Sequence, residues 1–352
     1  MTKTVLIDLT MLKQPNSGLG SVTSAFAKGI VESGIKDMHF QLLMPPGHTM
    51  PVPDNMSLIT ANTWKKHFTR ALPKAEVWHS TYQHFKFLRL TSETRQIITI
   101  HDLNFLYEKK PHRAKHYLNL MQKRIDRAAA IVAISSFVAD ELRQHLNVKS
   151  KHLEVIYNAV NDLSEAPDQC PTFIRSEQKP FFFSIGAIRP KKNFHVLLDL
   201  MKRFPDMDLY ICGNMDDTTY VSHLRERITN EGITNVYLPG NISEIEKVWL
   251  YRHCSAFLFP SKFEGFGLPV IEAMHFGKPV FSSPLTSLEE VCGGHAFMWQ
   301  DFNTDHMEQI IRENLPAFGV DKEKVAAMKR YAASFSLDIN INAYLSLYRK
   351  LF

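Results

Sequence analysis

The sequence predicts an α/β protein of two doubly wound domains, each built on a parallel sheet. Short apolar segments alternate with amphipathic ones, and this alternation stops at the polar stretch 161–179 and then restarts. Alternating strands and helices are typical of parallel sheets. The chain length of 352 residues agrees with two domains, because it exceeds what one hydrophobic core usually fills.

The first domain is expected to span residues 1–165. Its strands are predicted, from the short apolar runs, at residues 4–9, 39–44, 77–79, 96–100, 130–134 and 153–157. Its helices are predicted at residues 20–33, 115–128 and 136–145. The ligand site of such a domain lies at the carboxyl ends of the strands, so polar residues there are the candidates for function.

The second domain is expected to span residues 166–335. Its strands are predicted at residues 181–186, 208–212, 236–238, 256–260 and 279–282. Its helices are predicted at residues 193–204, 219–231, 242–253, 269–276, 286–292, 304–315 and 321–350. Two such domains facing across a cleft would suit a ligand with two chemically different ends.

Composition excludes several classes of protein. The net charge of +5 is mildly basic, and no dense basic module points to nucleic acid. The four cysteines form no CxxC pair, which makes a zinc ribbon improbable and indicates buried, reduced thiols. The N-terminal apolar stretch is too short for a signal peptide, and no run reaches the ~20 apolar residues of a membrane span. We therefore expect a cytoplasmic location, with attachment to the inner face of the membrane left open.

The segment from Glu264 to Glu272 carries the strongest functional signal. It reads EGFGLPVIE and joins a predicted strand to a predicted helix that begins near Pro269. Gly265 and Gly267 allow a ligand to approach the backbone closely, and the helix N-terminus favours an anion. A glutamate near a helix start and a glycine turn each have ordinary structural explanations; their combination at a strand end indicates a binding site.

A second signal lies between Gly186 and Asn193, directly after another predicted strand. Three cations, Arg189, Lys191 and Lys192, gather there at the ligand edge of the sheet. Arginine and lysine bind phosphate oxygens, and fixed cations can neutralise a leaving diphosphate without a metal ion. The alternative is a solvated basic loop.

These two segments resemble motifs of the retaining glycosyltransferases of family 4, which have the GT-B fold. The EGFGLPVIE segment is similar to the E-x7-E motif, continued by the GKPV at 277–280, and PKKN at 190–193 is similar to a PRKN-type phosphate loop. The resemblance implies that Glu264 lies by the donor sugar and Glu272 binds the ribose. It also implies that the backbone of Gly265, Phe266, Gly267 and Leu268 contacts sugar and phosphate, and that helix 336–352 packs on the first domain.

In the first domain the resemblance covers a glycine loop and a His-Asp pair. Gly18 and Gly20 are similar to the family's first glycine loop, which lies over the donor diphosphate. His101 follows a strand, and the resemblance places it beside the donor sugar near its reacting end, with Asp102 structural or facing the acceptor. Tyr82 also falls at a strand end and is assigned to the acceptor side. A packed histidine bonded to the backbone is the alternative for His101.

The resemblance implies transfer of a hexosyl group from a nucleotide sugar to a saccharide or lipid-linked acceptor, with retention of configuration. Glu264, His101 and Lys192 are the expected catalytic residues. The donor is a substrate; no cofactor and no metal are expected. GDP-mannose is the first choice because the phosphate loop resembles that of bacterial mannosyltransferases of polysaccharide assembly. The alternatives are a UDP-sugar transferase, an epimerase of the same fold and a non-catalytic sugar-nucleotide binder.

A basic segment at residues 109–127 suggests one more partner. It holds seven cations against the single acid Asp126, with Leu118, Met121 and Ile125 at helical spacing. The two interpretations are a core-facing helix with a solvated face, and attachment to an anionic membrane surface that carries a lipid-linked acceptor. The Trp64-Lys-Lys-His-Phe68 segment would extend such a surface.

Overall fold

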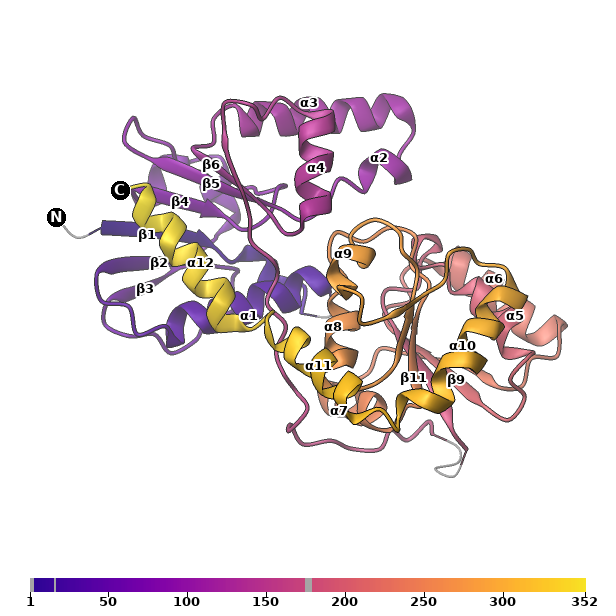
Figure 1. Cartoon of the computed structure of the whole chain (residues 1–352). Helices are drawn as coiled ribbons and strands as arrows, with labels where there is room; N and C mark the ends of the chain where they lie inside the picture. The colour runs from indigo at the N-terminus through magenta and orange to yellow at the C-terminus, as the bar shows by residue number, and fades with distance from the viewer. Residues whose placement is uncertain (1–2, 16, 175–178) are drawn as a thin grey trace. The chain divides into compact units, whose positions relative to one another are not determined.

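The computed structural model describes residues 3–15, 17–174 and 179–352 and divides the chain into two compact units (Figure 1). Unit 1 comprises Met1–Val160 and Ser336–Phe352, and unit 2 comprises Asn161–Phe335. Each unit has its own parallel sheet and its own hydrophobic core. The α/β class predicted from the alternation of apolar segments is confirmed.

Unit 1 contains a parallel sheet in the order β3-β2-β1-β4-β5-β6-β7. Its strands are β1 (Lys3–Asp8), β2 (Met38–Met44), β3 (Met56–Thr60), β4 (Val77–Ser80), β5 (Arg95–Ile100), β6 (Ala130–Ala133) and β7 (His152–Val155). The central strands are apolar on both faces because helices cover both, as expected for a parallel sheet. The chain moves to one side after β1 and returns to the other side at β4, so the strand order reverses between these two strands.

The helices of unit 1 include one that comes from the far end of the chain. They are η1 (Thr10–Lys13), α1 (Gly18–Glu32), η2 (Thr63–Lys66), η3 (Thr69–Ala71), α2 (Phe105–Glu108), α3 (Pro111–Ile125), α4 (Ser136–His145) and α12 (Leu337–Lys350). In α12 the side chains of Ile341, Tyr344 and Tyr348 repeat at helical spacing and join the core of unit 1. This helix packs against α1 (Figure 1).

Unit 2 contains a parallel sheet in the order β10-β9-β8-β11-β12-β13. Its strands are β8 (Phe181–Ile185), β9 (Asp208–Cys212), β10 (Val236–Gly240), β11 (Ala256–Phe259), β12 (Val280–Ser282) and β13 (Phe297–Met298). Its helices are η4 (Pro190–Lys192), α5 (His195–Met201), α6 (Thr218–Asn230), α7 (Glu244–His253), α8 (Leu268–His275), α9 (Leu288–Cys292), α10 (Thr304–Phe318) and α11 (Lys322–Ala333). Here the strand order reverses between β8 and β11.

Most predicted elements lie within a few residues of the observed ones, but the last helix was wrong. The apolar pattern predicted one helix over 321–350; instead α11 ends at Ala333 and α12 begins at Leu337, which agrees with the helix expected at 336–352 from the resemblance. Ser336 caps the new helix by accepting a hydrogen bond from the amide of Ile339. The short elements β3, β13 and α2 were not predicted, because their apolar runs are too brief to show a period.

Candidate functional site

The candidate site of unit 2 lies where its strand order reverses. In open parallel sheets, ligands bind outside the carboxyl ends of the strands at this reversal point. The segment after β8 holds Gly186 and η4, and the segment after β11 runs from Pro260 to the start of α8. Both motif segments singled out in the sequence therefore meet at the position that the topology assigns to a ligand.

Lys192 and Glu264 join the two segments directly. The Nζ atom of Lys192 lies 2.5 Å from Oε1 of Glu264, and only 12% and 13% of the two side chains are exposed. The same ammonium lies 5.0 Å from the centre of the Phe259 ring. Gly186 lies beneath this lysine, since a Cβ atom there would be 3.2 Å from Cε of Lys192. A cation of this kind, mostly buried but still in part exposed, can exchange a carboxylate partner for an anionic ligand.

The loop that carries Glu264 is fixed by its neighbours. The amide of Glu264 donates to Oγ1 of Thr286 at 3.0 Å. The hydroxyl of Ser287 donates to the carbonyls of Glu264 and Phe266, both at 3.0 Å. Gly267 caps α8 with φ +108°, a left-handed conformation that favours glycine, and a Cβ there would lie 2.6 Å from Leu288. The loop is therefore built to present the N-terminus of α8 at the site.

Glu272 is held on α8 by two side chains of α7. Lys247 pairs with Oε1 at 2.9 Å, and the hydroxyl of Tyr251 donates to Oε2 at 2.8 Å. Burial lowers the pKa of Lys247, but the Glu272 carboxylate raises it by more, so this pKa lies above its usual range. Burial, and then the same carboxylate, raise the pKa of Tyr251. Both partners therefore stay protonated, and Glu272 keeps a fixed orientation.

The other predicted donor residues of unit 2 surround this pair in different ways. Arg189 is exposed at the start of η4. The carbonyl of Lys191 accepts from the amide of Lys262 at 2.8 Å, which ties the two loops together. The side chain of Phe266 is buried and packs against Phe335 at 5.6 Å, so only its backbone remains for a ligand. Gly265 and Leu268 belong to the same loop and helix start.

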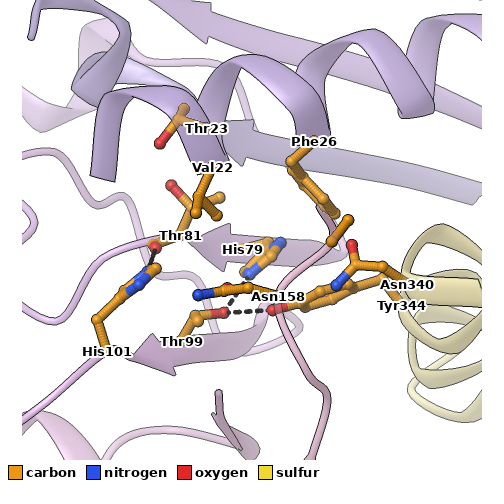
Figure 2. A pocket seen from close by; sticks show the side chains of 11 residues that line it. Val22, Thr23, Phe26, His79, Thr81, Thr99, His101, Asn158, Asn340 and Tyr344 are labelled. Carbon is orange, nitrogen blue, oxygen red and sulfur yellow. Dashed lines mark hydrogen bonds between the residues drawn. The ribbon is translucent and has the colours of Figure 1, made fainter. Parts of the chain in front are cut away.

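In unit 1, His101 follows β5 and lines a small cavity of about 20 Å³ (Figure 2). Its Nε2 lies 2.8 Å from the carbonyl oxygen of Thr81, which can only accept, so Nε2 carries the proton. Burial lowers the pKa of His101, while Thr81 and Asp102 raise it by less. The imidazole is therefore neutral near pH 7, with Nδ1 as a hydrogen-bond acceptor. His101 is therefore bonded to the backbone, as the alternative interpretation expects, and it also lines a cavity.

A buried network in the wall of this cavity connects the sheet to α12 (Figure 2). His79 bonds to the hydroxyl of Tyr348 at 2.7 Å and to Oγ1 of Thr99 at 2.9 Å, and Thr99 bonds to the hydroxyl of Tyr344 at 3.0 Å. Burial, and then the charge of His101, lower the pKa of His79 to about 3. His79 is thus a neutral structural group that fixes α12 on unit 1.

The glycine loop of unit 1 was expected to approach a ligand, and at Gly20 the structure also shows a packing reason for the glycine. Gly18 begins α1, Ser17 caps the helix by accepting from the amide of Gly20, and Asn16 lies outside the described residues. A Cβ at Gly20 would lie 1.9 Å from the carbonyl oxygen of Gln14. The glycine is needed for packing against the chain's own backbone, because the turn before α1 is tight.

The two acceptor-side predictions lie near His101. The ring of Tyr82 is 6.1 Å from that of His101, and burial raises the pKa of its hydroxyl. Oδ1 of Asp102 accepts from the amide of Asn104 at 3.1 Å, an Asx turn that gives this side chain a structural role. Gln83 accepts from the amide of His101 and donates to the carbonyl of Asp102, which fixes the segment after β5.

Several residues of the site were missed by sequence reasoning. Lys247 and Tyr251 belong to α7, whereas Glu272 belongs to α8, so no local sequence pattern connects them. The hydroxyl oxygen of Thr286 accepts a hydrogen bond from the backbone amide of Glu264, and no motif predicts this contact. Asp8, which lines a cavity of unit 1 together with Thr81 and Tyr82, could have been found, because a charged residue that ends a buried apolar strand is unusual.

The arrangement in unit 2 suits a phosphorylated ligand with hydroxyl groups. The Lys192 ammonium and the N-terminus of α8 provide positive charge. Glu264 and Glu272 provide two carboxylates that can accept hydrogen bonds from sugar hydroxyls. Fold and site together define the class of enzymes that bind nucleotide-linked sugars on doubly wound domains.

Comparison with known proteins places the chain in a family. The family model "Glycosyltransferase Family 4" matches residues 42–162, and the model "Glycosyl transferases group 1" matches residues 171–333. The first match ends just past the boundary between the units, and the second begins a few residues further on. Together they include all the motif segments except the glycine turn before α1. The chain belongs to this glycosyltransferase family.

Relatives of similar sequence are named as mannosyltransferases. The chain is 28% identical over 250 residues to O-antigen chain mannosyltransferase RfbU of Salmonella typhimurium. It is 27% identical over 263 residues to serotype-specific mannosyltransferase WbdA of Escherichia coli. These matches cover 69% of this chain in both cases, but 66% and 32% of the respective relatives. The matched part is therefore only a fraction of each relative, and a small one of WbdA.

Solved structures agree on the fold over nearly the whole chain. Sucrose-phosphate synthase of Thermosynechococcus elongatus superimposes with a TM-score of 0.78 at 15% identity, covering 99% of both chains. Anabaena Alr3699/HepE, solved in complex with UDP-glucose, gives 0.75 at 15% identity and also covers 99% of both. The predicted GT-B fold is thus confirmed.

Proposed function

We propose that this protein transfers a hexosyl group from a nucleoside diphosphate sugar to an acceptor hydroxyl, with retention of configuration. The observation that carries the proposal is the Lys192–Glu264 pair at the reversal point of unit 2, beside the N-terminus of α8. An ammonium and a helix N-terminus suit the diphosphate, and an adjacent carboxylate suits the sugar. Family membership supports the same assignment.

In the proposed reaction, the bond between the anomeric carbon and the diphosphate oxygen breaks while a bond to the acceptor oxygen forms on the same face of the sugar. The acceptor proton passes to the departing diphosphate oxygen, so no redox partner is needed. Lys192 and α8 stabilise the charge that develops on the leaving group. Glu264 orients the sugar, Glu272 binds the ribose hydroxyls, and neutral His101 accepts a hydrogen bond from a sugar hydroxyl.

GDP-mannose is the first choice of donor, and mannose is then the transferred sugar. RfbU is named as an O-antigen chain mannosyltransferase and WbdA as a serotype-specific mannosyltransferase. The HepE complex contains UDP-glucose, so a UDP-sugar is the alternative. The acceptor would be a saccharide or lipid-linked saccharide in polysaccharide assembly. We also propose that no metal ion is required, because Lys192 and α8 already supply positive charge at the expected phosphate position.

A panel of nucleotide sugars tests this function. GDP-mannose, UDP-glucose, UDP-galactose and ADP-glucose are each added to the protein in EDTA, and thermal stabilisation and slow donor hydrolysis are measured. A true donor at 100 times its Kd stabilises the protein by about 2.7 kcal/mol. We expect GDP-mannose to give the largest shift and to release GDP. Absence of any response to all four sugars would refute the function, and a response only with added Mg²⁺ would refute metal independence.

An epimerase on the same fold is the rival enzyme. It would change the configuration of the donor sugar without an acceptor and would leave the nucleotide attached. Chromatography of the donor after incubation separates the two cases: free nucleoside diphosphate indicates transfer or hydrolysis, and an isomeric nucleotide sugar indicates an epimerase.

Attachment to an anionic membrane surface is a further part of the proposal. In α3 and the turn before it, Lys110, Arg113, Lys115 and Lys123 are exposed, whereas Met121 and Ile125 are buried. The apolar stripe is thus core-facing, and the cations form the outer face. No helix among the described residues is long and apolar enough to cross a membrane.

Vesicle co-sedimentation tests this attachment. Binding to vesicles with anionic lipids should exceed binding to neutral vesicles and should fall in a Lys115→Glu/Lys123→Glu variant. Equal sedimentation with both vesicle types would contradict the attachment.

A further inference from the structure

A second cavity, of about 190 Å³, lies at the strand reversal point of unit 1. Its walls come from the segment after β1 and the segment after β4, the two strands between which the order reverses. This is the position at which a doubly wound sheet binds a ligand. The cavity shares Thr81 with the His101 cavity, so the two lie side by side at the same edge of the sheet.

We infer that this cavity binds the terminal sugar of an oligosaccharide acceptor, and that a row of aromatic rings beside it binds the sugars that precede it. This inference rests on the proposed transferase function and names the class of its acceptor.

Asp8 is the polar group around which the cavity is built. It is the last residue of β1, it is only 4% exposed, and it lines the cavity. Oδ1 accepts from the amide of Thr10 at 2.9 Å. Burial is the largest influence on this carboxyl and raises its pKa to about 6; Thr10 and then Lys13 lower it by less. A buried carboxyl that no cation neutralises strongly is suited to accept hydrogen bonds from neutral hydroxyl groups.

An aromatic row begins at this cavity. The rings of Tyr82 and His84, which line it, are 5.3 Å apart, and His84 is 5.9 Å from Tyr117 on α3. All three side chains are half-buried. Burial, and then the charge of Arg124, lower the pKa of His84, so this ring is neutral near pH 7. The rings meet edge to face, with interplanar angles of 78° and 70°. Because they are only half-buried, part of their apolar surface is left open for pyranose rings to pack against.

Arg124 fixes the segment that joins the cavity to the row. Its guanidinium donates to the carbonyls of Gln83 and Phe85 and lies 4.6 Å from the centre of the Phe85 ring. This arginine, which the sequence assigned to a basic surface, is therefore occupied in shaping the site. Lys13 and Lys86 are exposed at the cavity's walls, where they stay hydrated. The Asp8 carboxyl group at the centre accepts hydrogen bonds from hydroxyls, and aromatic rings lie alongside. Both features favour a saccharide over a phosphate group.

Binding is tested by NMR on the methyl group of Met11, which lines the cavity. The protein is labelled with [methyl-13C]methionine, and the Met11 signal is assigned with a Met11→Leu variant. Mono-, di- and trisaccharides of mannose, glucose, galactose and N-acetylglucosamine are the probes. We expect one series to shift Met11 and to leave the buried Met328 of unit 2 unchanged. Failure of every probe to shift Met11 would overturn the inference.

Acceptor length is tested by kinetics with the sugar series that shifts Met11. In Tyr117→Leu, KM for a trisaccharide acceptor should rise by about three- to tenfold, as expected for loss of one aromatic contact. KM for the monosaccharide should not change. Phe68→Leu, which alters an exposed ring of the same unit, is the matched control. An equal rise for all acceptor lengths, or no rise for any, would overturn the role of the row.

Asp8→Asn tests the terminal-sugar subsite. KM should rise at least tenfold for acceptors of every length, whereas the exposed control Asp54→Asn should match the wild type. An unchanged KM in Asp8→Asn would overturn the subsite. Failure of the transferase function is recognised separately, because the wild type would then release no nucleoside diphosphate from any donor even if Met11 still shifted with saccharides.

Discussion

Replacement of Asp8 by Asn should stabilise unit 1 at neutral pH while weakening acceptor binding. The carboxyl group of Asp8 is buried at the end of β1, and burial raises its pKa from 3.8 to about 6 despite the opposing effects of Thr10 and Lys13. Asn has the same shape and no charge. The substitution therefore removes the cost of an ionised buried carboxylate and keeps most of the packing.

The sign and size of the effect follow from proton linkage. Between pH 4 and 6 the folded state holds a proton that the unfolded chain has released, so stability falls as pH rises through about 6. A shift of about two pKa units corresponds to about 3 kcal/mol in full. Between pH 4.5 and pH 8 the loss is about 2 kcal/mol, because most unfolded chains have already released this proton at pH 4.5, so the rest of the fall lies at lower pH. The Asp8→Asn variant has no titrating carboxyl group at this position, so its stability does not fall in this pH range for this reason.

The assay is urea unfolding at pH 4.5, 6 and 8, read by hydrogen exchange of β1 and β2 peptides. Exchange is used because the two units need not unfold together. Relative to the wild type, Asp8→Asn should gain about 2 kcal/mol between pH 4.5 and pH 8. The groups that share the cavity, Lys13, Tyr82, His84 and Lys86, are present in both proteins and cancel in the comparison. A difference that stays constant across pH would refute the reasoning.

Two other changes have predicted effects on folding and binding. Gly267→Ala should cost roughly 1–3 kcal/mol and weaken nucleotide binding, because φ is +108° and the new Cβ would lie 2.6 Å from Leu288. In the control Gly319→Ala nothing lies within 4 Å of the new Cβ, so the free energy of unfolding should change by no more than about 0.5 kcal/mol. Denaturation measures the stability of both variants, and calorimetry measures their nucleotide binding. Equal effects in the two variants would contradict the predicted strain at Gly267. Tyr348→Phe should cost about 1–3 kcal/mol in thermal unfolding, since buried His79 loses a hydrogen-bond partner; an unchanged Tm would contradict this.

The fold class was predictable because parallel sheets produce a repeated local pattern. Buried strands such as β9 and well-capped helices such as α4 have start and stop signals within a few residues of sequence. Apolar periodicity alone merged α11 and α12, because it continues through both helices and only Ser336 marks the boundary; the helix at 336–352 was expected from the family resemblance. Local pattern could not show that the chain changes unit there.

The site was only partly predictable for a different reason. Glu264 and Lys192 belong to sequence motifs, and the structure brings their side chains together across two loops. The partners of Glu272 come from another helix, so their positions depend on packing that no spacing encodes. The packing of Gly20 against Gln14 was not predicted, because a glycine needed for backbone packing and one needed for a ligand look the same in sequence.

The central claim is that Lys192 and Glu264 hold the donor, and calorimetry of nucleoside diphosphate binding tests it most directly. The Lys192→Met/Glu264→Gln double variant removes the pair without leaving one charge buried alone, and Lys202→Met removes an exposed cation of the same unit. Loss of a charged hydrogen bond to phosphate predicts at least tenfold weaker binding of GDP or UDP in the double variant, with Lys202→Met equal to the wild type. Equal affinity in all three proteins, each folded by thermal melting, would contradict the account.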